Sequence, residues 1–111
     1  MTDVPVDAND LLFEARTTLG FSVRVTVARW NLIVTAKHPV MAGHEGLARA
    51  ALETPDEVRQ SRIDPEVLLL LQGGGDEALD VRVVKRVAEG AFLITAYPTD
   101  AIKEGVRIWP T

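Results

Sequence analysis

The sequence of 111 residues lacks cysteine and has few aromatic residues. The absence of cysteine excludes a disulfide scaffold and any metal site built on thiolates. No apolar run approaches the roughly 18–20 residues of a membrane-spanning helix, and no basic-then-apolar leader for export is present. These absences predict a soluble, cytoplasmic protein, and a length of 111 residues with 47% apolar residues suits one self-sufficient core.

Basic residues are absent from the first 15 positions, which instead contain four acidic residues: Asp3, Asp7, Asp10 and Glu14. The whole chain has 16 acidic and 12 basic residues, so these four acids account for its net charge of −4. Composition therefore predicts an acidic, loosely held arm over residues 1–14 and a single, electrically neutral domain over residues 15–111. A net charge that belongs to the arm does not exclude a local basic site.

Strands are predicted wherever apolar and polar residues alternate. Phe21, Val23 and Val25 alternate with polar residues, which indicates a half-buried strand. Turn residues separate the later candidate strands, which are EVRQSR (57–62), VLLLLQ (67–72), LDVRVVKRV (79–87), AFLITAY (91–97) and GVRIW (105–109). The joins GGGD and EG are typical of hairpins, so the strands they connect should be antiparallel neighbours. VLLLLQ does not alternate, which predicts a strand covered on both faces or one that meets a partner.

Helices are predicted nearer the amino terminus. Residues 44–54 have the clearest helical stripe, with Pro55 just beyond it. Residues 27–37 fit a helix slightly better than a strand, and residues 11–18 fit either. The sequence thus predicts an α+β fold, with an N-terminal strand and two helices packed on a mainly antiparallel, four-stranded meander.

Polar side chains on the predicted strands are candidates for an anion-binding surface. Strict alternation places Glu57, Arg59 and Ser61 on one face. In the last long strand it places Leu93, Thr95 and Tyr97 on the face opposite to the one that bears Phe92, Ile94 and Ala96. Arg82 and Arg86 should share an outer, solvated face opposite Lys85. Arginine, hydroxyl groups and an aromatic ring are the groups that bind a phosphodiester and a base.

Several kinds of site have no sequence support. His38 and His44 are six residues apart across a proline and a glycine, which is not the spacing of a zinc helix. The triple glycine lacks the Lys-Ser/Thr and the helix that a phosphate loop needs. No nucleophile elbow or dinucleotide fingerprint is present. No metal or cofactor is therefore expected.

A set of short motifs occurs in order between residues 19 and 109: T-x-x-R-W-x-x-I (26–33), K-H-P-x-M (37–41), T-P-D-E-V-R-x-S (54–61), V-V-K (83–85), I-T-A-Y-P-T-D-x-I-K-x-G (94–105) and I-W (108–109). Together they resemble small uncharacterised domains of bacteria and their phages that are grouped with the barnase–EndoU–colicin–RelE-like nuclease fold. The resemblance implies helices packed on a four-stranded antiparallel sheet and metal-independent RNA cleavage. This chain has Asn31 and Leu32 where such domains often carry a histidine, so RNA binding without cleavage also remains open.

The resemblance also implies roles for six residues that match its polar motifs: His38, Arg59, Ser61, Lys85, Thr95 and Tyr97. His38 is expected to act as the general acid or base, because imidazole titrates near neutral pH. Arg59 and Lys85 are expected to hold the phosphate, Ser61 and Thr95 to orient it, and Tyr97 to stack or donate a hydrogen bond.

Two other classes of function fit the sequence. A protein–protein or oligomerisation module would use the leucine-rich strand, through Leu68 and Leu70, to bind a neutralising partner or a second copy. A small-molecule pocket enclosed by a bent sheet is the third possibility. Neither a membrane nor DNA is expected as a partner.

Overall fold

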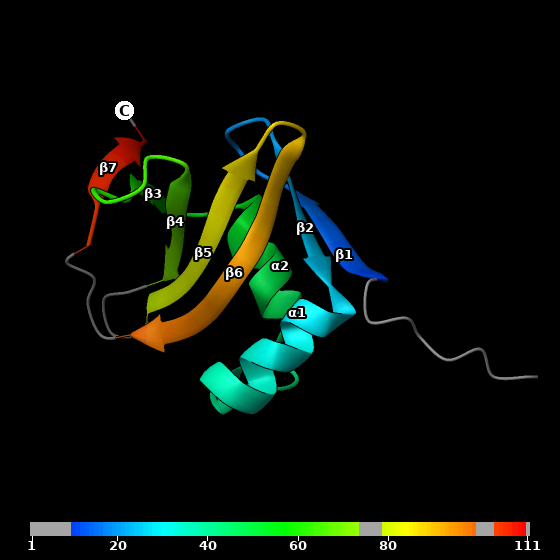
Figure 1. Cartoon of the computed structure of the whole chain (residues 1–111). Helices are drawn as coiled ribbons and strands as arrows, with labels where there is room; N and C mark the ends of the chain where they lie inside the picture. Colours follow the sequence, from blue (N-terminus) through cyan, green and yellow to red (C-terminus); the bar gives the residue numbers. More distant parts are fainter. Residues whose placement is uncertain (1–9, 74–78, 100–103, 111) are drawn as a thin grey trace, which may run out of the picture.

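The computed structural model describes residues 10–73, 79–99 and 104–110. Within these residues, seven strands form one sheet in the order β1-β2-β6-β5-β4-β3-β7, and α2 lies against one face of it (Figure 1). The strands are β1 (Leu11–Arg16), β2 (Ser22–Thr26), β3 (Glu57–Gln60), β4 (Val67–Gly73), β5 (Leu79–Val87), β6 (Gly90–Thr99) and β7 (Val106–Trp109). The helical segments are α1 (Val27–Leu32), η1 (Ile33–Lys37), η2 (Pro39–Met41) and α2 (Glu45–Glu53). None of the described helices is long and apolar enough to cross a membrane.

The predicted four-stranded meander is wrong, although the general α+β character is correct. The antiparallel neighbours β3, β4, β5 and β6 are present, but β2 adds to β6 in parallel, β1 adds to β2, and β7 adds to β3. The ambiguous stretch 11–18 contains the whole of β1, because the backbone of Leu11–Arg16 pairs with β2. The predicted arm boundary after Glu14 therefore falls inside a strand. Residues 1–9 and most of the predicted glycine turn lie outside the described residues.

Both predicted helices are confirmed. The backbone N–H of Arg29 donates to Oγ1 of Thr26 at 3.1 Å, which caps α1, and the helix continues through η1 until Pro39. In α2, Ala48, Ala51 and Leu52 are buried. The indole Nε1 of Trp30 donates to Oε1 of Glu45 at 2.7 Å, a hydrogen bond that joins α1 to α2.

The leucine-rich strand β4 is buried on both faces, which was one of the two predictions for it. Leu68 and Leu70 belong to the main core beneath α2, and their side chains are 4% and 0% exposed. Leu69 and Leu71 form a second, smaller cluster with Val81 on the opposite face. A partner therefore has no access to Leu68 and Leu70.

A β-bulge in β6 makes the predicted assignment of its faces wrong. Leu93 pairs with Val84, whereas Val83 pairs with Thr95, so Ile94 is an additional residue between the two pairs. The additional residue reverses the alternation from this point on. Phe92, Thr95 and Tyr97 consequently share one face, while Leu93 and Ala96 lie in the main core.

Arg82 also contradicts its prediction, since its side chain is buried and not solvated. It lies on β5 between Leu70 and Ala96, both members of the main core. Alternation correctly placed Arg82 and Arg86 on one face, but α2 covers that face only in part. Arg86 is exposed, with its guanidinium carbon 4.0 Å from the ring centroid of Phe21.

Candidate nucleic-acid interface

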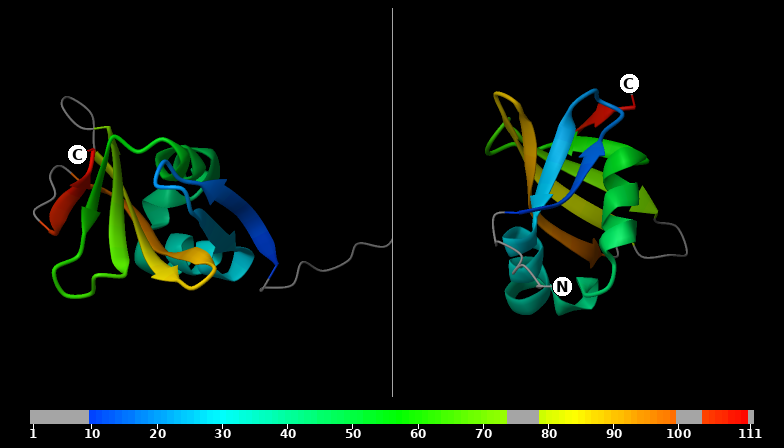
Figure 2. Two further views of the ribbon diagram at one scale, coloured as in Figure 1. Left: turned by 90° about the horizontal axis from the view of Figure 1, so that it is seen from above. Right: turned by 90° about the vertical axis from the view of Figure 1, so that its right-hand side faces the viewer.

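The face of β5 and β6 that is turned away from α2, here called the open face, has none of the described helices over it (Figures 1 and 2). Because of the bulge, Phe92, Thr95 and Tyr97 follow one another along β6 on this face. Phe92 is 37% exposed, which is unusual for a large aromatic side chain in a sheet. The row therefore combines the exposed ring of Phe92 with Thr95 and Tyr97, which are partly buried, and Tyr97 packs against the cluster of Leu69, Leu71 and Val81.

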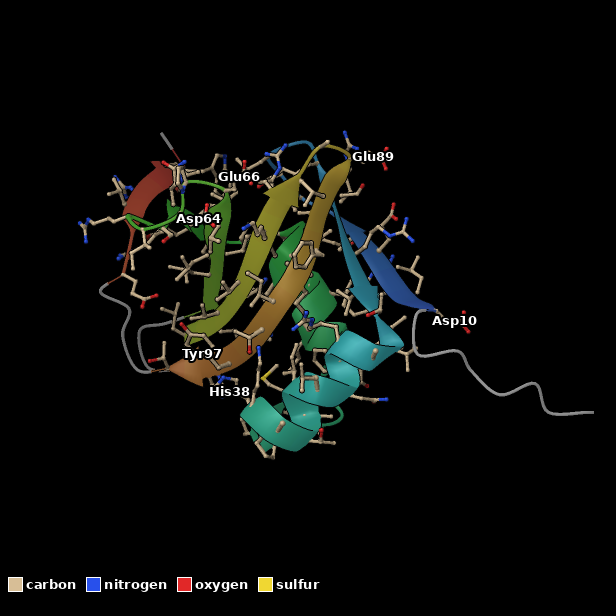
Figure 3. All side chains as sticks on the ribbon, in the orientation of Figure 1. Asp10, His38, Asp64, Glu66, Glu89 and Tyr97 are labelled. Carbon is tan, nitrogen blue, oxygen red and sulfur yellow. The ribbon has the colours of Figure 1, made fainter. Side chains whose placement is uncertain are left out.

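His38 lies at the carboxyl end of this row, next to Tyr97 (Figure 3). The centroids of the two rings are 5.2 Å apart, and their planes are tilted by 36°. Nζ of the adjacent Lys37 donates to the backbone oxygen of Ile94 at 3.4 Å, which brings an exposed cation to the bulge. Burial, and secondarily the negative charge of Glu104, raises the pKa of Tyr97 above its usual 10.0.

Thr95 lies between Tyr97 and Phe92 in the row, directly across from Val83 of β5. Its hydroxyl oxygen is buried and has no hydrogen-bond partner among the described residues. A buried, unsatisfied hydroxyl is uncommon in proteins, because its desolvation is not offset. Thr95 is thus the predicted site residue whose environment most clearly departs from that of an ordinary strand residue.

Lys85 lies opposite Phe92 across the β5–β6 pair, and its charge already has a partner. Its Nζ lies 3.1 Å from Oδ2 of Asp64 in the connection between β3 and β4. The pKa of Asp64 is lowered from its usual 3.8 by the backbone N–H of Glu66 and by the hydrogen bond from Lys85 (Figure 3). Lys85 is therefore on the open face, but it is directed towards an acid.

Arg59 and Ser61 belong to a different part of the sheet. Arg59 forms an ion pair with Glu57 on the same strand, and its Nη1 donates to the backbone oxygen of Glu104 at 3.3 Å. Oγ of Ser61 accepts hydrogen bonds from the backbone N–H groups of residues 63 and 64. These contacts stabilise the β3 end of the sheet. The structure thus brings His38, Thr95 and Tyr97 together, with Lys85 one strand away, and separates Arg59 and Ser61 from them.

The sequence prediction missed two arginines at the other end of the row. Arg24 of β2 pairs in register with Phe92, and Arg29 of α1 lines, together with Arg24 and Phe92, a groove at this end of the row. Neither arginine has an ion-pair partner among the described residues. The alternation of β2 identified Arg24 as outward-facing, but the β2–β6 pairing that places it beside Phe92 is not visible in the sequence.

Among the described residues, no group of three or more histidine, aspartate and glutamate side chains could hold a metal ion. No family model, curated protein or solved structure matches the chain. The resemblance to the nuclease fold therefore remains a prediction.

Proposed function

We propose that this protein binds single-stranded RNA along β6 on the open face. The observation that supports the proposal is the bulge at Ile94, which aligns Phe92, Thr95 and Tyr97 on a face that none of the described helices covers. Aromatic side chains on an open sheet are the usual platform on which unpaired bases stack. Such a ligand agrees with the cytoplasmic location expected from the sequence.

Basic side chains flank this row at both ends. His38 lies beside Tyr97, Lys37 reaches the backbone of Ile94, and Arg24 and Arg29 line the groove beside Phe92. Phosphate groups need cationic or neutral donors at intervals along the strand, and arginine provides them in a planar fork. The distribution of charge therefore fits a backbone that follows β6, despite the net charge of −4.

The binding test uses a short fluorescent oligouridine and measures its anisotropy as protein is added. We expect the affinity to fall as salt concentration rises, because bound cations release counterions from the phosphates. Phe92→Ala should weaken binding about tenfold, since one stacked base contributes ~1–3 kcal/mol. Lys37→Ala should weaken binding and reduce the salt dependence.

Two matched controls keep this test specific. Leu47 is 53% exposed on α2, and Arg107 is exposed on β7, four strands away from β6 in the sheet order. Substituting either with alanine should leave the affinity unchanged. Absence of binding at low salt, or equal weakening by the controls and by Phe92→Ala, would contradict the proposal.

RNA cleavage is a second candidate function, and the contact between His38 and Tyr97 favours it. In this reaction His38 removes the proton of a 2′-hydroxyl group, and O2′ forms a bond to the adjacent phosphorus. The bond from phosphorus to O5′ breaks, and the Tyr97 hydroxyl gives its proton to O5′. The Tyr97 hydroxyl carries this proton at neutral pH, because its pKa lies above 10.0. The products are a 2′,3′-cyclic phosphate and a 5′-hydroxyl group.

Cleavage is tested by incubating total RNA with the protein in EDTA. Activity that is lost in both His38→Ala and Tyr97→Phe, while oligouridine binding persists, would support cleavage at this end of β6. An inactive wild-type protein that binds oligouridine would leave RNA binding as the function. Activity that both variants retain would remove His38 and Tyr97 from the reaction.

A further inference from the structure

A groove opens at the Phe92 end of the row, between β2, α1 and the β5–β6 turn. Its volume is about 450 Å³, within the range of roughly 300–1,000 Å³ that is typical of small-molecule sites. It is lined by Arg24, Thr26, Arg29, Val87, Glu89, Ala91, Phe92 and Leu93. The groove thus combines two cations, one acid and apolar walls.

The two arginines define where an anionic group would bind. Arg24 and Arg29 come from different elements, and among the described residues neither forms an ion pair within 4.0 Å, although Glu14 of β1 lies across from Arg24 in the β1–β2 register. The capping bond between Thr26 and the backbone of Arg29 fixes the start of α1 next to the end of β2. Two guanidinium groups that line one groove and are not held in an ion pair can still bind a phosphate group through their planar forks.

The apolar walls define where a flat, uncharged group would bind. Val87 is 46% exposed and Phe92 is 37% exposed, and both line the groove. Phe92 lies in register with Arg24, so the aromatic ring is adjacent to the cationic side of the groove. A phosphate group bound by the arginines would thus carry an attached base to within reach of Phe92.

Glu89 restricts the ligand further. Its carboxylate belongs to the turn between β5 and β6 and is exposed (Figure 3). An ionised carboxylate only accepts hydrogen bonds, and it repels a phosphate group. A ligand must therefore direct its anionic end towards the arginines and a hydrogen-bond donor towards Glu89. A ribose hydroxyl group is such a donor, and deoxyribose lacks the one at the 2′ position.

We infer that this groove binds one ribonucleotide, with its phosphate at Arg24 and Arg29, its base on Phe92 and its 2′-hydroxyl donating to Glu89. The inference rests on the proposed RNA binding and specifies its selectivity for RNA over DNA. It assigns to Arg24, Arg29 and Glu89 roles that are independent of His38 and Tyr97.

The test measures the affinities of adenosine monophosphate, its 2′-deoxy form, adenosine and inorganic phosphate by calorimetry and by amide chemical shifts. We expect the ribonucleotide to bind about tenfold more tightly than the deoxy form, as for a hydrogen bond to a charged group. Arg24→Ala and Arg29→Ala should weaken binding of the nucleotides more than that of adenosine. Arg107→Ala is the matched control and should change none of these affinities.

Glu89→Ala provides a readout that a structural role would not give. It should bring the affinities of the ribonucleotide and the deoxy form together, and it should strengthen the binding of inorganic phosphate. Equal affinities of the two nucleotides for the wild-type protein would overturn the inference, as would nucleotide binding that does not depend on Arg24 and Arg29.

Failure of this inference is distinguishable from failure of the proposed function. Oligouridine binding that depends on Phe92 and Lys37, without nucleotide binding in the groove, would overturn the inference and leave RNA binding intact. Nucleotide binding in the groove without oligouridine binding would support a nucleotide site and contradict binding of a strand along β6.

Discussion

The ring of His38 lies against the ring of Tyr97, with 5.2 Å between their centroids. His38 follows the last residue of η1, and Tyr97 lies near the end of β6, so 59 positions of sequence separate the two. The contact exists because η1 passes the carboxyl end of the row on the open face, where Lys37 also reaches the backbone of Ile94. The helical segment therefore contributes directly to the surface that the sheet presents.

Tyr97 should titrate at a higher pH than free tyrosine. It is the only tyrosine in the chain, so tyrosinate absorbance reports on it alone. Burial, and then the charge of Glu104, raises its pKa above 10.0. The neutral hydroxyl contributes stability that is fully present below the pKa in the unfolded chain and is lost as pH rises through the higher folded-state pKa. We expect the thermal unfolding temperature to fall in that alkaline range.

Glu104→Gln separates the two causes of the shift in Tyr97. The substitution should lower the pKa of Tyr97 only in part, because burial is the larger cause. Tyr97→Phe should remove this contribution to the alkaline loss of stability. A titration midpoint equal to that of free tyrosine in the folded wild-type protein would show that the phenol is fully hydrated.

Asp64→Asn should destabilise the protein at neutral pH but not in strong acid. The pKa of Asp64 is held below 3.8, so its charged form is favoured by folding. This stabilisation is present above the pKa of the unfolded chain and is lost as pH falls through the lower pKa of the folded chain. We expect the difference in thermal unfolding temperature between the wild type and Asp64→Asn to shrink to zero as pH falls through this range.

The same substitution should also strengthen RNA binding, because it releases Lys85 from its ion pair on the open face. Glu66→Gln is the control, since Glu66 contacts Asp64 through its backbone N–H and not through its side chain.

For the stability prediction, a difference in unfolding temperature between the wild type and Asp64→Asn that stays constant at all pH values would mean that Asp64 acts through its shape and not through its charge.

Arg82→Met should raise the free energy of unfolding. Arg82 is 0% exposed, its Nη1 donates to the backbone oxygen of Val81, and its Nε and Nη2 have no partner among the described residues. Burial lowers its pKa, which the charge of Asp80 only partly offsets. Removing unsatisfied, desolvated donors should stabilise the protein by about 1–3 kcal/mol in denaturant unfolding.

Arg62→Met, at an exposed position, is the control for Arg82→Met and should change stability little. If Arg82→Met instead destabilises the protein, the guanidinium group must be satisfied by a group that the described residues do not include.

Much of the local structure could be predicted from the sequence, because it depends on neighbouring residues. The apolar stripe in residues 44–54 predicts the helix observed as α2, and the alternation of Phe21, Val23 and Val25 predicts the strand observed as β2. The parallel pairing of β2 with β6 joins segments that are far apart in the sequence, and no local pattern encodes it. The pairing of β7 with β3 is also distant in the sequence, and these two long-range pairings extend the sheet beyond the predicted four strands.

The candidate site was predicted less well, for a specific reason. Alternation fails where a strand contains an additional residue, and the bulge at Ile94 placed Phe92 on the same face as Thr95 and Tyr97. The polar motifs included His38 and Tyr97 among six candidates without placing them together, and the structure brings their rings into contact. They also suggested Arg59, whose charge is satisfied by Glu57 on the same strand, a contact that the alternation itself implies.

Gly105→Ala should detach β7 from the edge of the sheet. Gly105 has φ of +79°, and a Cβ atom there would lie 2.7 Å from the backbone oxygen of Gln60. Both the left-handed backbone and the contact oppose any side chain, so we expect a loss of roughly 1–3 kcal/mol in the free energy of unfolding. Amide exchange should show that protection falls first in β7 and β3.

Gly46→Ala is the matched control for Gly105→Ala. Gly46 lies in α2, where a Cβ atom would have no neighbour within 4 Å. Alanine favours a helix over glycine by about 0.5–1 kcal/mol, so this variant should be more stable than the wild type. The two substitutions add the same methyl group, and opposite signs of the stability change would attribute the loss at residue 105 to its backbone conformation and its contact with β3. A loss of similar size at both positions would contradict the close packing of residue 105 against Gln60.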